Sequence, residues 1–282
     1  MATYNDCYNI LQDVRIGINE WNPGLVKGTD TTGVFPNSYI INKINQSQQF
    51  IWNIVFQSFP EYFLTSASLS ISSSVATLPA DCYKIRRIED SDGNKISPMN
   101  VDEKHISSTA GSRYHYYRYG NTLRVDEDNI SGTYTIWYFR RCREITTGMS
   151  SAGGSKSLTL ATTARKEADY YNNMLITNVD DDWTDTILDY SSLRVSTLES
   201  QTGAANKWYG IVPSDLPEVF HPLIAEKTII ELKRQPMSTL RVSREDIELF
   251  NMNLVESLKS FGSLANSDYT ANDIFTAFEP IL

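Results

Sequence analysis

The spacing of apolar residues changes twice along this chain of 282 residues, and this change limits the possible folds more than any other feature. Near both ends, apolar residues recur every three or four positions, as they do on one face of an α-helix. Between the ends, apolar residues alternate with small polar ones, which is the period of a β-strand with one buried face. The pattern therefore predicts helices at the two ends and strands in the middle.

The helical stretches number four. The first two are expected before residue 60, where a proline ends the second stretch. A third begins after Asp215 and ends before Pro236. The fourth follows Ser243 and Asp246, which are spaced as a capping pair. Its apolar stripe consists of Ile247, Phe250, Leu254, Leu258 and Phe261.

The alternating stretches form two groups. Residues 68–145 predict four to six short antiparallel strands, and the dipeptides Asp92-Gly93 and Gly120-Asn121 are typical of tight turns between them. Residues 147–157 are mostly small and predict a linker. The alternation then resumes and continues to about residue 210, which indicates a second β module.

These patterns together predict an α+β fold. Residues 1–65 and 213–264 are expected to form one helical bundle, into which the β material is inserted. Residues 66–148 are expected to form an antiparallel β region, and residues 149–212 a second small β module. Residues 265–282 lack a helical period but hold several large apolar side chains, so an extended C-terminal arm that docks elsewhere is expected.

The composition is that of an ordinary globular protein, with 41% hydrophobic and 21% charged residues. A net charge of −9 argues against a protein that grips nucleic acid through phosphates, because that needs a surplus of Lys and Arg. No apolar run approaches the ~20 residues of a membrane span, so no contact with a membrane is expected. The chain also begins without the features of a signal peptide, which predicts synthesis in the cytoplasm.

The polar residues predict no catalytic, cofactor or metal site. Three histidines (His105, His115 and His221) fall outside any known catalytic or zinc motif, and the three cysteines form no C-x-x-C pair. The acidic stretch "NVDDDWTDT" would suit calcium, but it lacks the glycine and distal glutamate of an EF-hand loop, so a solvated hairpin tip is favoured. In "FRRCREITTG", Cys142 lies between two arginines that would point away from it on a strand. The sequence thus predicts a protein that is not an enzyme.

The stretch "VATLPADCYKIRRIE" reads as a strand, Leu-Pro-x-Asp and a second strand. In this it resembles the head-to-tail adaptor (connector, or head completion) proteins of tailed bacteriophages, of the short-tailed type. "SGTYTIWYFRRCREI" resembles the closing strand, and "SDLPEVFHPLIAEKTIIEL" the return to helix. A fourth stretch, "DYYNNMLITNVDDDWTDTILDYSSLRVSTLE", is similar to a β element of phage structural proteins, with Asn173 where glycine is usual. The first three stretches and the opening helices follow the family order over roughly residues 4–262.

The resemblance implies a structural virion protein at the head-tail junction, assembled in the host cytoplasm. Its copies would form a ring, usually a dodecamer, beneath the portal protein, with the helical bundle as the ring wall. The ring would extend the DNA channel and attach a tail protein of the nozzle or hub type, and genomic DNA would pass an acidic surface without specific binding. The candidate portal-docking residues of the arm are Tyr269, Ile274, Phe275, Phe278, Ile281 and Leu282. The candidate contacts to a subunit or the tail are Arg140, Arg141, Arg143, Trp183 and Tyr190.

Two other classes of function remain open at this point. The second β module is rich in Trp and Tyr, so a tail or fibre-associated module that recognises host surface glycan is the alternative. The aromatic residues concerned are Trp183, Tyr190, Trp208 and Tyr209. A cell-wall hydrolase would need a carboxylate pair or a zinc site in a cleft, whereas the acidic residues are scattered.

Overall fold

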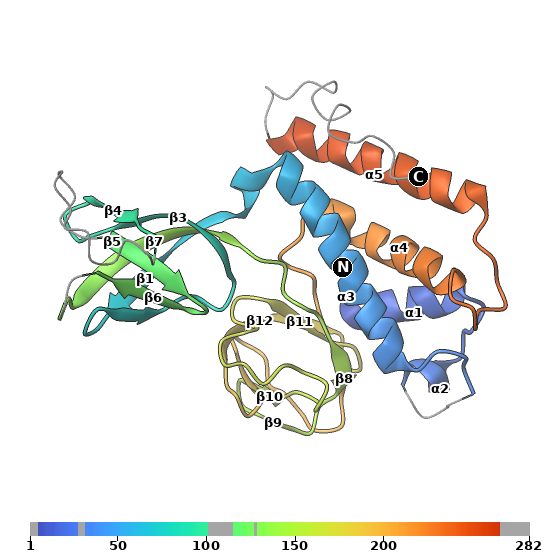
Figure 1. The fold of residues 1–282 in the computed structure, drawn as a ribbon. Helices are drawn as coiled ribbons and strands as arrows, with labels where there is room; N and C mark the ends of the chain where they lie inside the picture. Colours follow the sequence, from blue (N-terminus) through green and yellow to red (C-terminus); the bar gives the residue numbers. More distant parts are fainter. Residues whose placement is uncertain (1–4, 28–31, 101–114, 127–128, 266–282) are drawn as a thin grey trace. The chain divides into compact units, whose positions relative to one another are not determined.

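The computed structural model describes residues 5–27, 32–100, 115–126 and 129–265. The chain divides into two compact units (Figure 1). Unit 1 combines Met1–Phe59 with Cys142–Leu282, and unit 2 is the continuous stretch Pro60–Arg141.

Unit 2 is a curled antiparallel sheet with one parallel pair, β4 with β5. It opens with the 3-10 helix η1 (Pro60–Phe63). Its strands, counted over the described residues, are β1 (Leu64–Ile71), β2 (Val75–Thr77), β3 (Cys82–Glu89), β4 (Lys95–Pro98), β5 (His115–Tyr119), β6 (Thr122–Val125) and β7 (Gly132–Arg140). The order across the sheet is β1-β7-β3-β4-β5-β6-β2. Because the outermost strands β1 and β2 are consecutive in the chain and meet at the Ser72–Val75 bridge, the sheet nearly closes into a barrel.

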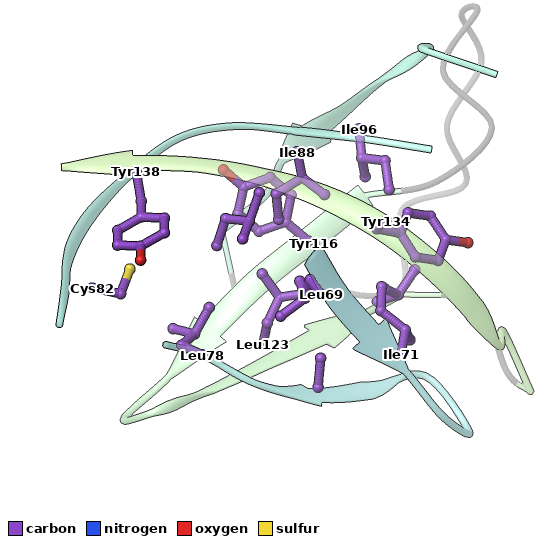
Figure 2. Packing of buried hydrophobic residues seen from close by; sticks show 13 residues of the cluster. Leu69, Ile71, Leu78, Cys82, Ile88, Ile96, Tyr116, Leu123, Tyr134 and Tyr138 are labelled. Atoms are coloured by element: carbon purple, nitrogen blue, oxygen red, sulfur yellow. The ribbon is translucent and has the colours of Figure 1, made fainter. Parts of the chain in front are cut away.

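The interior of this barrel is apolar, and Figure 2 shows side chains from several strands pointing into it. Leu69, Ile88 and Leu123 come from three different strands, and each is at most 2% exposed. At one end Tyr138 lies near Cys82, and its hydroxyl donates to Asp81 Oδ1 at 2.8 Å. The expected turns at Asp92-Gly93 and Gly120-Asn121 are confirmed, since they join β3 to β4 and β5 to β6.

Unit 1 contains the second curled sheet, with the order β8-β14-β11-β12-β13-β10-β9. Its strands within the described ranges are β8 (Thr147–Met149), β9 (Ala152–Gly154), β10 (Ser157–Thr159), β11 (Leu175–Asn178), β12 (Trp183–Tyr190), β13 (Val195–Leu198) and β14 (Trp208–Ile211). The outermost strands are again consecutive in the chain. Gly153 lets β9 lie close against the segment between β13 and β14, because a Cβ there would overlap the backbone of Gly203 and Ala204.

The α-helices of the described residues all belong to unit 1. They are α1 (Cys7–Gly17), α2 (Pro23–Val26), α3 (Asn37–Ser58), α4 (His221–Lys233) and α5 (Arg244–Ala265), with the 3-10 helix η3 (Glu218–Phe220) before α4. Helix α4 packs against α1, α3 and α5 (Figure 1). Phe261 of α5 lies between two other rings, 5.2 Å from Phe59 and 5.6 Å from Phe220. The expected capping pair is confirmed by reciprocal 3.0 Å hydrogen bonds between Ser243 and Asp246.

The expected fold class is wrong. The chain is mostly two curled, nearly closed sheets, each with seven strands in the described residues, and it has few helices. It is not a helical bundle that carries a small β insertion. The apolar stripes of the helices are regular and conspicuous in the sequence, whereas most strands have only three to five residues. The order of strands in the sheet also depends on pairs such as Leu64 with Phe139, which no local pattern reveals.

Candidate functional site

A buried polar centre of unit 1 is the pair of Arg143 and Asp215, whose side chains are 4% and 0% exposed. Two hydrogen bonds of 2.7 Å join guanidinium and carboxylate, from Nε to Oδ2 and from Nη2 to Oδ1. The backbone N–H of Arg143 donates to the same Oδ2 at 3.0 Å. The last nitrogen, Nη1, donates to the carbonyl oxygens of Tyr170 and Asn172. Such a bidentate fork is the geometry in which a buried Arg is most stable.

This pair fastens three segments that are distant in sequence: the start of the second sheet, the loop before β11 and the turn before α4. The sequence predicts Arg143 as a contact to another chain, whereas its side chain lies inside its own unit and its nitrogens serve partners there. Asp215 was missed as its partner. The only sequence signal for it is its place in "SDLPE", one of the stretches that resembles the adaptor family.

Cys142 precedes this centre. Part of the residue is exposed, yet burial of its thiol raises its pKa well above the ordinary value, and the carboxylate of Asp215 adds to the shift. The positive charge of Arg143 acts in the opposite direction but does not reverse it. The thiol therefore stays protonated at neutral pH, which is its unreactive form.

The other two arginines of the same stretch belong to unit 2. Arg140 is the last residue of β7 and pairs with Cys82 in the ladder. Arg141 follows, and its backbone N–H donates to the carbonyl of Asp81 at 2.7 Å. Both side chains are half-buried. Their expected role as contacts to another chain stays a prediction.

The two aromatic contact candidates differ in exposure. Trp183 is half-buried at the start of β12, opposite Asn178. Tyr190, at the end of the same strand, is 0% exposed, and its hydroxyl donates to the carbonyl of Arg165. Its ring stands edge-on to Tyr171, with centroids 4.8 Å apart. Tyr190 is thus part of the core, and Trp183 retains some accessible surface.

Other tyrosine hydroxyls of unit 1 also bind backbone groups. Those of Tyr170, Tyr171 and Tyr209 accept from the backbone nitrogens of Glu144, Arg165 and Ala161. These hydrogen bonds fix the backbone before β8, at Glu144, and after β10, at Ala161 and Arg165. The abundance of Tyr therefore serves packing here. Of the four aromatic residues considered for glycan binding, Tyr190 and Tyr209 are fully buried, and Trp208 packs on Tyr8 with centroids 6.1 Å apart.

The acidic tip between β11 and β12 is held by the protein itself. Asn178 Oδ1 accepts from the backbone nitrogens of Asp180 and Asp181. The two carboxylates form ion pairs with Lys27 and Lys207, respectively. No cluster of three or more possible metal ligands occurs within the described ranges. None of the helices of those ranges is long and apolar enough to cross a membrane.

The remaining candidates have simple placements. His221 is buried, and its Nε2 lies 2.9 Å from the carbonyl oxygen of Leu216 and 3.1 Å from that of Pro213. Burial lowers the pKa of His221, so the ring is neutral at pH 7 and donates from Nε2. His115 is half-buried on β5, and His105 lies outside the described residues. The six candidate residues of the C-terminal arm also lie outside them.

A basic face lies on β3 of unit 2, and the sequence patterns did not predict it. This strand makes two bulges against β7, one between Cys82 and Lys84 and one between Ile85 and Arg87. Each bulge lets two successive side chains face outward instead of one. The exposed residues are Tyr83, Lys84, Arg86 and Arg87. We call them the β3 strip; the broken alternation of "CYKIRRIE" is the signal that would have indicated it.

Neighbouring residues hold parts of the β3 strip in place. Arg118 of β5 donates from Nη1 to the carbonyl of Tyr83 at 2.8 Å. The guanidinium of Arg87 lies 5.0 Å from the centre of the Trp137 ring and 3.1 Å from Glu89. Lys84 and Arg86 have no acidic partner in the part of the chain that the structure describes. The strip therefore presents two unpaired cations to solvent.

Comparisons with known proteins add no family to this picture. No protein-family model matches the chain, and a search of curated proteins found no significant relative. The likeness to phage adaptors therefore stands on the sequence stretches alone.

Proposed function

We propose that this protein is a structural component of a tailed-phage particle, a head-to-tail adaptor that binds beneath the portal. In this proposal several copies form a ring that extends the DNA channel and gives the tail its attachment platform. The partners are the portal protein above, a tail protein below and neighbouring copies of the chain. Residues 266–282 dock on the portal through their apolar side chains.

One observation carries the proposal. Two of the stretches that resemble the adaptor family, "SGTYTIWYFRRCREI" and "SDLPEVFHPLIAEKTIIEL", meet at the buried pair of Arg143 and Asp215. If the resemblance were accidental, the two stretches would not be expected to meet at one buried, fully hydrogen-bonded ion pair. The buried polar groups of unit 1 described above, such as Arg143, Asp215 and His221, have structural partners within the chain, which suits an assembly component.

The test is the mass of the complex that forms when the purified chain is mixed with the portal ring of the same particle. Sedimentation or native mass spectrometry is expected to show many copies added per ring, near twelve. Deleting residues 266–282 is expected to abolish the addition. The full-length double variant Phe275→Ser/Phe278→Ser is the milder test, because it removes two apolar side chains of the arm without shortening the chain. Absence of binding at every salt concentration would refute the proposal.

A further inference from the structure

We infer that the β3 strip of one copy binds the groove between α4 and α5 of a second copy. The inference rests on the proposed ring assembly for its biological setting, but its contact is defined by residues of this chain alone. It assigns to the molecule the two different, complementary surfaces that a closed ring of identical subunits requires.

The charge of the molecule is divided unequally between its units. Pro60–Arg141 contains ten Lys and Arg and ten Asp and Glu, so unit 2 has no net charge. The whole chain has a net charge of −9, which therefore resides entirely on unit 1. A cationic surface of unit 2 is thus attracted to unit 1 of another copy at long range, before any contact forms.

The β3 strip is such a surface. Lys84 and Arg86 are exposed and lack acidic partners within the described residues, and Arg87 adds a third cation next to Glu89. Tyr83 is 49% exposed beside them and supplies apolar area. Bulges re-aim side chains, and the two bulges in this strand of eight residues leave all four side chains exposed.

The groove on unit 1 has the opposite chemistry. It lies between α4 and α5 and has a volume of about 330 Å³. Its acidic residues are Glu226 of α4 and Glu256 of α5, and its apolar ones include Val219 and Leu223. Both oxygens of Glu226 lie 3.1 Å from the Asn253 amide nitrogen, which is a neutral donor.

Neither carboxylate of the groove is paired with a cation among the described residues. The ion pairs of α4 and α5 involve other acids, namely Glu231, Asp246 and Glu248. Two unpaired carboxylates beside apolar side chains form a site for a Lys or Arg whose stem packs on the apolar wall. The two unpaired cations of the β3 strip match the two carboxylates in number and are opposite to them in charge. Its exposed tyrosine ring matches the apolar wall.

A nucleic acid is the other polyanion that this strip would attract. The chain as a whole is acidic, and its negative charge opposes binding of phosphates outside the strip itself. Trp137 is covered by Arg87, so its ring is not open to stack on a base. The observations therefore favour the acidic groove of a second copy.

The experiment uses two charge-reversed forms of the full-length chain. One carries Lys84→Glu and Arg86→Glu in the strip, and the other carries Glu226→Lys and Glu256→Lys in the groove. Self-association is measured by sedimentation at an ionic strength of about 0.01 M, where the Debye length is about 30 Å, and again at about 0.15 M. Lys166→Glu and Asp189→Lys, which change exposed charges elsewhere on unit 1, are the matched controls.

The wild type is expected to self-associate at low ionic strength, and to self-associate less at high ionic strength. Each reversed form alone is expected to associate at least about tenfold more weakly, because like charges then face each other. An equimolar mixture of the two forms is expected to regain the association, since every strip then meets a groove of opposite sign. The control variants are expected to behave as the wild type, and circular dichroism checks that all forms are folded.

Three results would overturn the inference. They are a wild type that stays monomeric at low ionic strength, reversed forms that associate normally, and a mixture that fails to regain association although both forms are folded. Binding of a single-stranded oligonucleotide by the wild type, lost in the strip variant while self-association persists, would assign the strip to nucleic acid instead. Portal binding is measured separately, so a failed adaptor proposal and a failed groove contact are told apart.

Discussion

At the scale of single residues, the pair of Arg143 and Asp215 makes the sharpest prediction for stability. Arg143→Met leaves a buried carboxylate without its cation, and such losses cost about 3–5 kcal/mol. In the double variant Arg143→Met/Asp215→Asn the charge is gone, while the Asn side-chain oxygen still accepts from the backbone N–H of residue 143. Urea unfolding is expected to find the double variant more stable than the single one. Equal stability of the two variants would show that the buried charge is not the main cause of the loss of stability in Arg143→Met.

Asp6 predicts a dependence of stability on pH. It caps α1 through a 2.9 Å bond from Asn9 N to its Oδ1, is 0% exposed, and has no hydrogen-bond partner for Oδ2 within the described residues. Burial raises its pKa from 3.8 to about 6. Between these values the folded protein holds a proton that the unfolded chain releases, so this residue makes stability fall as pH rises from about 4 to 6.

Asp6→Asn removes this titration and keeps an oxygen for the cap. The difference in free energy of unfolding, variant minus wild type, is expected to be on the order of 2 kcal/mol more favourable to the variant at pH 7 than at pH 4. Urea unfolding at several pH values measures this difference. The same pH profile for both proteins would contradict the assignment, and Asp189→Asn at an exposed position of β12 is the control.

At the scale of elements, the sequence predicted what depends on near neighbours and failed where distant strands decide. The helical stripe of α5 and its cap at Ser243 involve residues three or four positions apart, and both were found. The β3 strip was missed because bulges form only against β7, about fifty residues away. Asp215 was missed for the same reason, since its partner Arg143 lies 72 positions earlier.

The close backbone contact of β9 in the second sheet gives the prediction at this scale. Gly153 lies against the backbone of Gly203 and Ala204, which cannot move aside as a flexible side chain would. Gly153→Ala is therefore expected to lower the free energy of unfolding by at least about 1–3 kcal/mol. Gly154→Ala is the control, because its Cβ would meet only the Ser157 hydroxyl at 3.0 Å, which can rotate. Thermal unfolding compares the two variants, and equal losses would contradict a special role of the backbone contact at Gly153.

At the scale of the whole molecule, the chain enters and leaves unit 2 through two neighbouring strands, β1 and β7. Leu64, near its start, pairs with Phe139, near its end, and antiparallel partners have Cα atoms about 5 Å apart. The centre that organises unit 1, Arg143 with Asp215, Tyr170 and Asn172, contains no residue of unit 2. This centre therefore has its polar contacts without Pro60–Arg141.

We accordingly predict that a linker of about six Gly and Ser residues can replace Pro60–Arg141 without unfolding unit 1. Hydrogen exchange is expected to show the Arg143 backbone N–H still protected, because its acceptor Asp215 remains buried. Replacing Thr147–Ile211 by the same linker is the matched control; it removes Tyr170 and Asn172 and is expected to expose that N–H. Rapid exchange in the first variant would mean that unit 1 depends on unit 2 for its fold. Because the β3 strip leaves with unit 2, the first variant is also expected to lose self-association while remaining folded.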